Sequence, residues 1–283
     1  DPPEGLVLIF DECHALKNPA AKRTRAARLL SARVRALKGF AWGLTGTPML
    51  NRAKELWHVL SVLGVAKEAY GDWNAFARLF DYATGEPRPD VADRLRVVSL
   101  MRRRLEVMPD LPVKTYRDIA VEIDPDTRRL ADELQQRLEA SGLRLNEVQD
   151  VAEIVAATKH ARLSIGEISK VRAALAKAKS GRLVEIVEEF EAEDKAVVVF
   201  SAHRGPVDML ATKPGWARIT GDDSSEDRTA TVAQFGSGAL KGVACTIRAA
   251  GVGLDGLQRA SHNVIFCDLD WTPGWNQQAE DRL

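Results

Sequence analysis

Short apolar runs alternate with longer segments of helical period along this 283-residue chain. The runs are four to six residues long and are bounded by Gly, Asp or Pro. Runs of this kind are typical of the buried strands of parallel sheets. We therefore predict strands at residues 6–10, 41–44, 196–200, 242–247 and 264–267.

Helices are predicted between these strands by apolar residues at spacings of three and four. Residues 20–37 contain one such segment, whose apolar positions are Ala26, Leu29, Leu30, Val34 and Leu37. Residues 180–193 form another, with acidic residues on the opposite face. A third helix is predicted at residues 224–235, because Ser224 and Asp227 form a Ser-x-x-Asp capping signal.

The alternation of strands and helices predicts an α/β fold with parallel sheets that are covered on both faces. It is interrupted at residues 124–179, where helical patterns at 124–140, 146–160 and 170–179 follow one another without a strand. The predicted division is a first lobe in residues 1–123, a helical linker in residues 124–180 and a second lobe in residues 181–283.

Composition narrows the class of protein but does not identify it. Forty Lys plus Arg residues balance forty Asp plus Glu residues. Three distant cysteines suggest neither a disulfide framework nor a zinc ribbon. No apolar run is long enough to span a membrane, and no signal-peptide pattern is present. We expect a soluble intracellular protein that does not act at a membrane.

The neutral total hides a local basic field. The stretch between Glu12 and Glu55 contains no acidic residue and ten Lys or Arg residues. Unpaired cations of this kind can neutralise nucleic-acid phosphates. A solvated helix face is an equally acceptable interpretation of the pattern.

Two acids follow directly on the first predicted strand. Asp11 and Glu12 would lie at the carboxyl edge of a parallel sheet, where ligands of such folds bind. One acid can hold Mg²⁺, usually through water, while its neighbour polarises an attacking water molecule. The dipeptide alone also occurs where a strand simply enters a loop. The neighbouring residues therefore decide between these interpretations.

Two sequence blocks, one beginning at these acids and one further along the chain, resemble one ATPase family. Residues 11–18 read Asp-Glu-Cys-His-Ala-Leu-Lys-Asn, and residues 44–48 read Leu-Thr-Gly-Thr-Pro. They are similar to motifs II and III of the Swi/Snf-related ATPases of helicase superfamily two, including the annealing-helicase branch and its bacterial and phage relatives. The resemblance implies two RecA-like lobes, with ATP and Mg²⁺ as cofactors and double-stranded DNA as partner.

The second half of the chain carries the same resemblance. Residues 197–201 resemble motif IV, residues 249–254 resemble motif V, and residues 278–282 resemble the start of motif VI. Thr272 departs from the pattern, because most members have Asn there. Five blocks in the family's order span nearly the whole chain.

The resemblance also implies roles for single residues. Asp11 would bind Mg²⁺, Glu12 would be the catalytic base, and Arg282 would be an arginine finger. The residues implied to couple the nucleotide to motif III are His14, Thr45 and Thr47. The further contacts that it implies are Gly253, Gln278 and Arg282 with the nucleotide, and Arg52, Arg102, Arg103 and Ser201 with DNA.

Two parts of the family pattern are missing from these residues. No Gly-Lys dipeptide occurs, so there is no Walker A loop to hold the phosphates. Leu283 follows the first Arg of motif VI. We therefore expect a first lobe that lacks its N-terminal part, and a chain that is inactive as an ATPase by itself.

Other interpretations compete with an ATP-driven DNA translocase. Residues 251–256 match the dinucleotide fingerprint G-x-G-x-x-G, but too little chain follows for the crossing helix of a Rossmann unit. The chain could instead be a catalytically dead DNA-binding or scaffold fragment. It could also be a helicase subunit of a restriction or phage-defence system.

Overall fold

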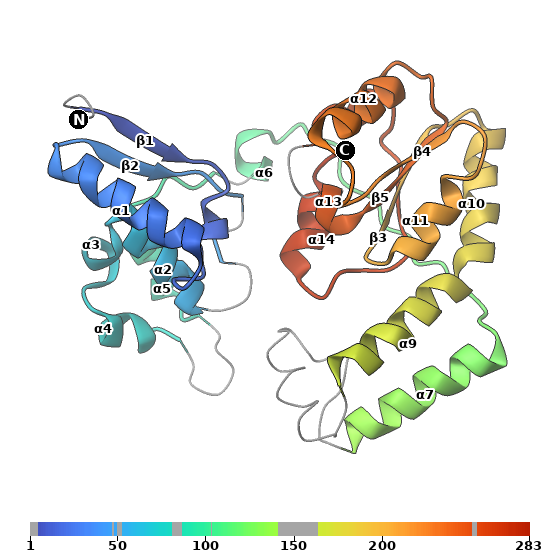
Figure 1. Ribbon diagram of the computed structural model, residues 1–283, viewed down its shortest axis with the longest axis horizontal. Helices are drawn as coiled ribbons and strands as arrows, with labels where there is room; N and C mark the ends of the chain where they lie inside the picture. The colour runs from blue at the N-terminus through green and yellow to red at the C-terminus, as the bar shows by residue number, and fades with distance from the viewer. Residues whose placement is uncertain are drawn as a thin grey trace. The chain divides into compact units, whose positions relative to one another are not determined.

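The computed structural model describes residues 5–46, 48–49, 53–80, 87–102, 104–140, 164–250 and 254–283, and every structural statement below concerns these residues. The chain divides into two compact units, Asp1–Arg117 and Asp118–Leu283 (Figure 1). Each unit contains its own parallel sheet.

The first unit is built on two parallel strands, β1 (Val7–Phe10) and β2 (Phe40–Gly43). Helix α1 (Lys22–Ala36) crosses between them, and the short 3-10 helix η1 (Cys13–Leu16) follows β1. The remaining helices of this unit are α2 (Ala53–Leu63), α3 (Ala66–Tyr70), α4 (Trp73–Ala77), α5 (Asp90–Leu95) and α6 (Arg104–Val107).

The predicted apolar face of α1 is correct at Val34 but wrong at Leu29 and Leu30. Leu29 and Leu30 are 73% and 49% exposed, whereas the buried residues are Thr24, Ala27, Ser31 and Val34. These four have small or β-branched side chains at spacings of three and four. Small side chains let the helix axis approach the sheet closely, so the contact face is not the most hydrophobic face.

The sheet of the first unit is covered on one face among the described residues. Phe10 and Ala41 pack toward α2 and η1. On the opposite face, Val7 and Ile9 lie beside Phe40 and Trp42 in register, and these four side chains are 41–60% exposed. The expectation that both faces are covered is therefore not met by the described part of this unit.

The second unit holds a four-stranded parallel sheet in the order β4-β5-β3-β6. Its strands are β3 (Val197–Ser201), β4 (Trp216–Ile219), β5 (Gly242–Thr246) and β6 (Val264–Phe266). Its helices are α7 (Pro125–Glu139), α9 (Ile165–Ala178), α10 (Ser180–Ala192), α11 (Arg204–Leu210), α12 (Ser225–Gly236), α13 (Ile247–Ala250) and α14 (Pro273–Glu280), with the 3-10 helix η2 (Leu257–Arg259).

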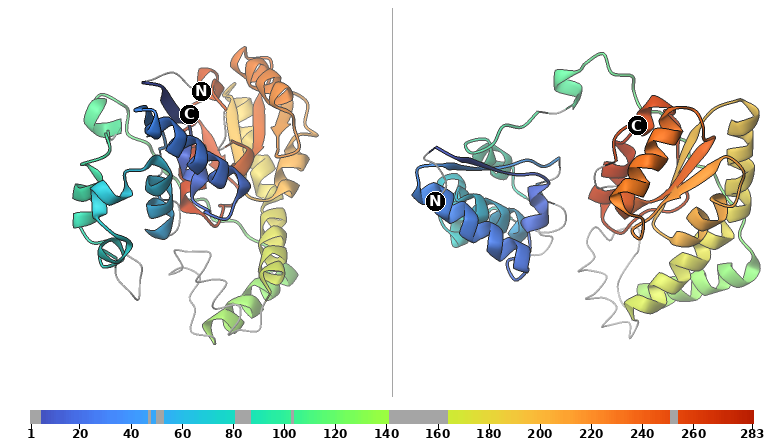
Figure 2. Two further views of the ribbon diagram at one scale, coloured as in Figure 1. Left: turned by 60° about the vertical axis from the view of Figure 1, so that its left-hand side comes forward. Right: turned by 45° about the horizontal axis from the view of Figure 1, so that its top comes forward.

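Alternate residues of the central strand β3 point into two separate cores. Val198 and Phe200 pack with Phe235 of α12 on one face. Val197 and Val199 pack with α10 and α11 on the other face. This sheet is covered on both faces, as the sequence predicted (Figure 2).

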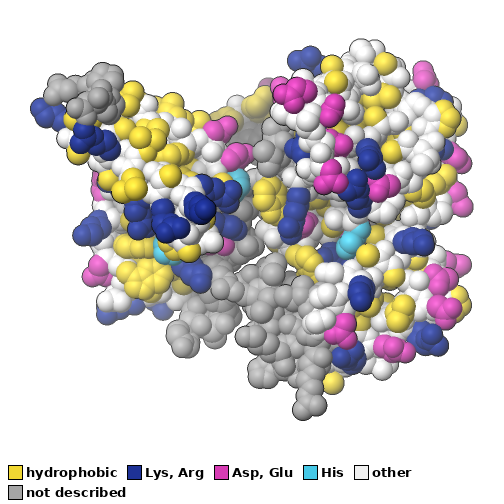
Figure 3. Space-filling model, in the orientation of Figure 1, with side chains coloured by type: hydrophobic (Ala, Val, Ile, Leu, Met, Phe, Trp, Pro, Cys, Tyr) yellow, Lys and Arg dark blue, Asp and Glu magenta, His cyan; other side chains and the backbone are white. Residues whose placement is uncertain are grey.

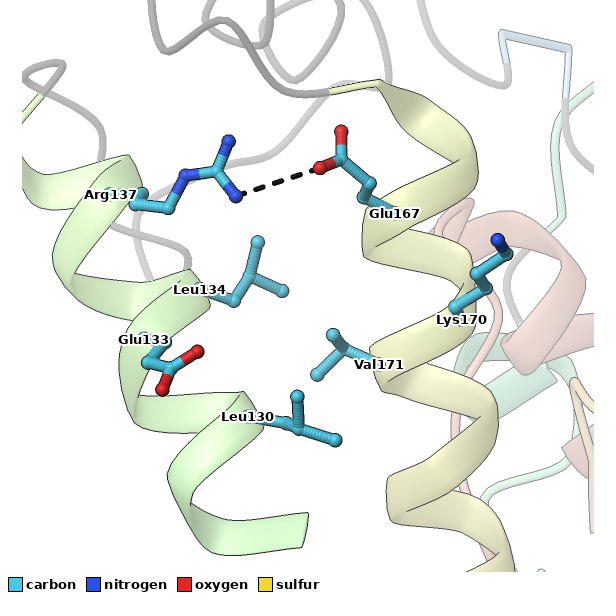
Figure 4. Close-up of a pocket in the computed structure, with 7 residues that line it drawn as sticks. All are labelled: Leu130, Glu133, Leu134, Arg137, Glu167, Lys170 and Val171. Atoms are coloured by element: carbon cyan, nitrogen blue, oxygen red, sulfur yellow. Dashed lines mark ion pairs between the residues drawn. The ribbon is translucent and has the colours of Figure 1, made fainter. Parts of the chain in front are cut away.

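Helices α7 and α9 form an antiparallel hairpin that belongs to the second unit (Figure 1). Helix α9 begins earlier than predicted, because Ser164 and Glu167 form a reciprocal capping box. A shallow pocket of about 350 Å³ lies between the two helices (Figure 4). Its lining combines the apolar residues Leu130, Leu134 and Val171 with Glu133, Lys170 and the Arg137–Glu167 ion pair of 3.6 Å, which closes one end. The helix predicted at residues 146–160 lies outside the described residues.

The corrected face of α1 gives a stability prediction. Val34→Ala should lower the free energy of unfolding by about 2 kcal/mol, because it removes buried methyl groups and leaves a cavity. Leu29→Ala, a control on the same helix, should change it by less than about 0.5 kcal/mol. Urea unfolding of both variants provides the measurement, and an equal or larger loss in Leu29→Ala would contradict the observed face.

Candidate active site

Both candidate acids lie where β1 ends, at the carboxyl edge of the first sheet. The exposed Asp11 accepts a hydrogen bond at Oδ1 from the Glu12 backbone N–H, at 2.9 Å. Glu12 has φ 47° and ψ 49°, in the left-handed region. This conformation costs a residue with a Cβ on the order of 1–3 kcal/mol and is concentrated at functional sites.

Motif II and motif III are joined by backbone hydrogen bonds. The Leu44 N–H donates to the Phe10 carbonyl, and the Cys13 N–H donates to the Leu44 carbonyl, both at 2.9 Å. The close approach requires Gly43, because a Cβ there would lie 2.8 Å from Cys13 Sγ and 2.9 Å from Leu63 Cδ1. Burial raises the pKa of the Cys13 thiol to about 11, so the thiol stays neutral and acts as a packing group.

His14 links the second acid to motif III. Its Nδ1 lies 3.0 Å from Glu12 Oε2 and 3.0 Å from Thr45 Oγ1. Burial lowers the pKa of His14, with smaller contributions from Lys17 and Arg23 in the same direction, while Glu12 opposes the shift. The imidazole is therefore neutral near pH 7, and a single ring nitrogen lies between two oxygens from different motifs.

One ion pair ties the end of motif II to the helix after motif III. Lys17 Nζ lies 3.2 Å from Glu55 Oε1 of α2, and both side chains are largely buried. The sequence blocks that contain Asp11 and Thr45 are thus connected by backbone bonds, by His14 and by this pair.

The carboxyl edge of the second sheet carries a cluster that the sequence did not predict. Ser201 is fully buried, and its hydroxyl donates to Asp268 Oδ1. The other carboxylate oxygen, Oδ2, lies 2.5 Å from Nδ1 of His203. Because Ser201 is engaged here, direct contact with DNA would require the cluster to open.

A second carboxylate on this edge connects motifs V and VI. Asp270 is 8% exposed and accepts hydrogen bonds from Arg248 Nε of α13 at 2.8 Å and from the Thr272 N–H at 3.0 Å. The side chain of Asn276 bonds both the N–H and the carbonyl of residue 270, at 2.8 and 3.0 Å. Thr272, which replaces the family's Asn, caps α14 through its backbone position and is itself buried.

The candidate nucleotide residues of the second unit lie on or just after α14. Gln278 is within α14, and Arg282 follows it. The Arg282 guanidinium donates to the Leu254 carbonyl at 3.1 Å. In the sequence, Leu254 directly follows the predicted nucleotide contact Gly253. The predicted site residues Gly253, Thr47, Arg52 and Arg103 lie outside the described residues.

The predicted basic surface lies on α1. Lys22, Arg23, Arg25, Arg28, Arg33 and Arg35 are all exposed, and Lys and Arg side chains gather over this helix (Figure 3). Arg102 is exposed as well, and it donates to the Met101 carbonyl at 3.1 Å. This surface fits an anionic partner.

The described residues also bear on metal binding and on membrane insertion. No group of three or more His, Cys, Asp or Glu residues there is arranged to hold a metal ion. No described helix is both long and apolar enough to cross a membrane.

The parallel sheets, with polar residues at their carboxyl edges, define the α/β class that the sequence predicted. The model of the SNF2-related domain family matches residues 5–175, and that of the helicase conserved C-terminal domain matches residues 178–283. The chain belongs to the SNF2-related family, as its motifs indicated.

Several known proteins are similar to this chain. Human DNA annealing helicase and endonuclease ZRANB3 is 28% identical over 98% of this chain and 26% of its own length. The SWI/SNF-related matrix-associated actin-dependent regulator of chromatin subfamily A-like protein 1 of Drosophila melanogaster is 25% identical, over 97% of this chain and 36% of its own length. The chain thus spans about a quarter to a third of these relatives.

Among solved structures, the Sulfolobus solfataricus SWI2/SNF2 ATPase core in complex with dsDNA is 18% identical to this chain. The TM-score is 0.40, and the match covers 94% of this chain and 58% of that one.

The environment of His14 predicts a pH dependence. In the unfolded chain His14 takes up a proton near pH 6.5, whereas the folded state resists protonation because the pKa is lowered. The unfolded state therefore binds more protons as the pH falls below about 6.5, and the free energy of unfolding should decrease between pH 7.5 and 5.5. His14→Gln should reduce this decrease, which urea unfolding at the two pH values would measure.

His58 provides an independent comparison, because burial together with Arg28 and Lys54 lowers its pKa as well. His58→Gln should remove a separate share of the pH dependence, so that the double variant has the smallest decrease. An unchanged decrease in His14→Gln would contradict a neutral, buried imidazole between Glu12 and Thr45.

Proposed function

We propose that this chain is part of an ATP-dependent translocase that acts on double-stranded DNA, and that Asp11 and Glu12 carry its hydrolytic chemistry. The observation that carries the proposal is the connection from Glu12 through His14 to Thr45, at 3.0 Å on each side. A carboxylate at the carboxyl edge of a parallel sheet is thereby linked to a second motif. Membership of the SNF2-related family and the annealing-helicase name of a relative support the same activity.

Asp11 is suited to hold Mg²⁺. The ion usually keeps several waters and is bound by one or two carboxylates together with substrate phosphates. One oxygen of Asp11 accepts the Glu12 N–H, while the side chain remains exposed at the sheet edge. This donor set fits a magnesium ion that is completed by water and ATP phosphates. When bound, the ion would neutralise charge on the phosphates.

Glu12 is suited to orient and deprotonate the attacking water. The left-handed backbone turns its side chain back toward His14 instead of continuing the strand. A glutamate side chain held in this position can accept a proton from the attacking water. A change at this carboxylate would be transmitted through His14 to Thr45 in motif III. Thr47 is proposed to take part in the same coupling.

Gln278, Gly253 and Arg282 are proposed to contact the same nucleotide from the second lobe. An arginine in this role stabilises the charge that develops on the transferred phosphoryl group. Its contribution would arise only when the two lobes close on ATP. Alternation between closed and open states would then move one lobe along DNA by a shift in population.

DNA is proposed to bind the basic residues of the first lobe. The exposed cations of α1 and Arg102 support this role, since phosphate contacts supply most of the sequence-independent affinity. Arg52 and Arg103 are proposed as further contacts, and Ser201 would join them only when its bond to Asp268 opens. The reaction is proposed to be annealing or remodelling of duplex DNA rather than strand separation, and the annealing-helicase name of a relative supports this choice.

Replacement of Glu12 tests the proposal directly. In the full-length protein, Glu12→Gln should retain ATP binding and lower DNA-stimulated turnover by about 10²- to 10⁴-fold, the range for a general base. Glu68→Gln makes the same chemical change at an exposed position of α3 and should leave turnover unchanged. Turnover of Glu12→Gln at the level of this control would refute the assignment.

A further inference from the structure

One face of α9 lies along the segment that leads from β6 into α14. Arg172, Ala176 and Lys179 are spaced by four and three residues, so they project from the same side of the helix. All three contact residues 267–271. Helix α9 thus runs alongside residues 267–271, the segment that immediately precedes α14.

Hydrogen bonds fix the backbone of this segment at two residues. Lys179 Nζ donates to the Cys267 carbonyl at 3.1 Å, and Cys267 Sγ lies 3.7 Å from the Ala176 carbonyl oxygen. Two residues further, the Arg172 guanidinium donates to the carbonyl of Leu269. These bonds satisfy main-chain carbonyls that have already left the sheet.

Arg172 also stacks on Trp271. Its Cζ lies 3.8 Å from the centroid of the Trp271 ring, well within the range of a cation–π interaction. The Trp271 side chain packs on the apolar cluster of the hairpin, which consists of Leu134 and Leu138 of α7 and Ile168 of α9. The hairpin and Arg172 together therefore hold this indole.

Trp271 lies immediately before the N-cap of α14. The preceding residue, Asp270, is bonded to Arg248 of α13 and to Asn276 of α14. The following residue, Thr272, is the N-cap of α14. A shift of Trp271 would therefore move both the cap and the helix that carries Gln278 and leads to Arg282.

We propose that Arg172 is a positioning residue, which clamps Trp271 against the α7–α9 hairpin and thereby sets the place of α14 and Arg282 during ATP hydrolysis. Arg172 does not contact the nucleotide in this proposal. It acts through Leu269 and Trp271. The role rests on the proposed function, because Arg172 would influence the rate of ATP hydrolysis from a position outside the family motifs.

The test uses the full-length protein and two measurements. Arg172→Met keeps the length of the side chain but removes its charge and its planar donor fork. Hydrogen exchange of the backbone amides of residues 267–283 should become on the order of tenfold faster in this variant, and kcat for DNA-stimulated ATP hydrolysis should fall on the order of tenfold, as expected for the loss of a partly buried stacked cation. Nucleotide affinity should not change.

Arg182→Met is the matched control. Arg182 lies on the neighbouring helix α10 and is bonded to Glu185 and Glu189. Its replacement by Met removes the same charge at a position away from residues 267–271. Both measurements should equal those of the wild type in this control. Unchanged exchange in residues 267–283 of Arg172→Met would overturn the clamp, and faster exchange with unchanged kcat would overturn the positioning role.

Arg172→Lys decides the case in which Arg172→Met loosens the whole second unit. It retains a cation above the indole but cannot reproduce the planar fork. Reduced kcat with wild-type exchange in β3 and β5 supports the proposal, and wild-type kcat overturns it. A wild-type protein without DNA-stimulated turnover would refute the proposed function itself, while the exchange measurement would still test the clamp.

Discussion

The close packing of η1 against the end of β2 is the constraint on which the candidate site depends. Gly43 leaves room for Cys13, and the Leu44 backbone bonds both Phe10 and Cys13 at 2.9 Å. These contacts turn the chain immediately after β1, force Glu12 into its left-handed conformation, and bring His14 to Thr45. The strain at Glu12 is tolerated because the surrounding backbone bonds and buried side chains determine its geometry.

The second unit uses the same architectural rule with different residues. Ser201 at the end of β3 and Asp268 just after β6 are brought together because the two strands pair in parallel. Asp270 follows two residues after Asp268. Asp270 joins α13 to α14 and so connects the motif V block with the motif VI block. In both units, parallel strands place polar groups at one edge, and those groups then fix the loops and helices that follow.

Sequence patterns predicted much of this arrangement, because strand composition and motif order are local properties. The strand at 242–247, the cap at Ser224 and the parallel sheets agree with the structure. Leu29 and Leu30 were wrongly predicted to be buried, because the buried face of α1 carries the small residues Ala27 and Ser31, and Ala27 packs with Leu16 and Val62. The pairing of His203 with Asp268 was missed because 65 residues separate them and only the β3–β6 pairing makes them neighbours.

In the proposed function residues of both lobes act on one ATP molecule, and replacement of Arg282 is the most direct test. DNA-stimulated turnover and nucleotide affinity would be measured side by side in the full-length protein. Arg282→Ala should lower turnover by roughly a thousandfold or more with nearly unchanged nucleotide affinity, and Arg282→Lys should recover little because an ammonium lacks the planar fork. Normal turnover in Arg282→Ala would show that Arg282 does not act on the nucleotide.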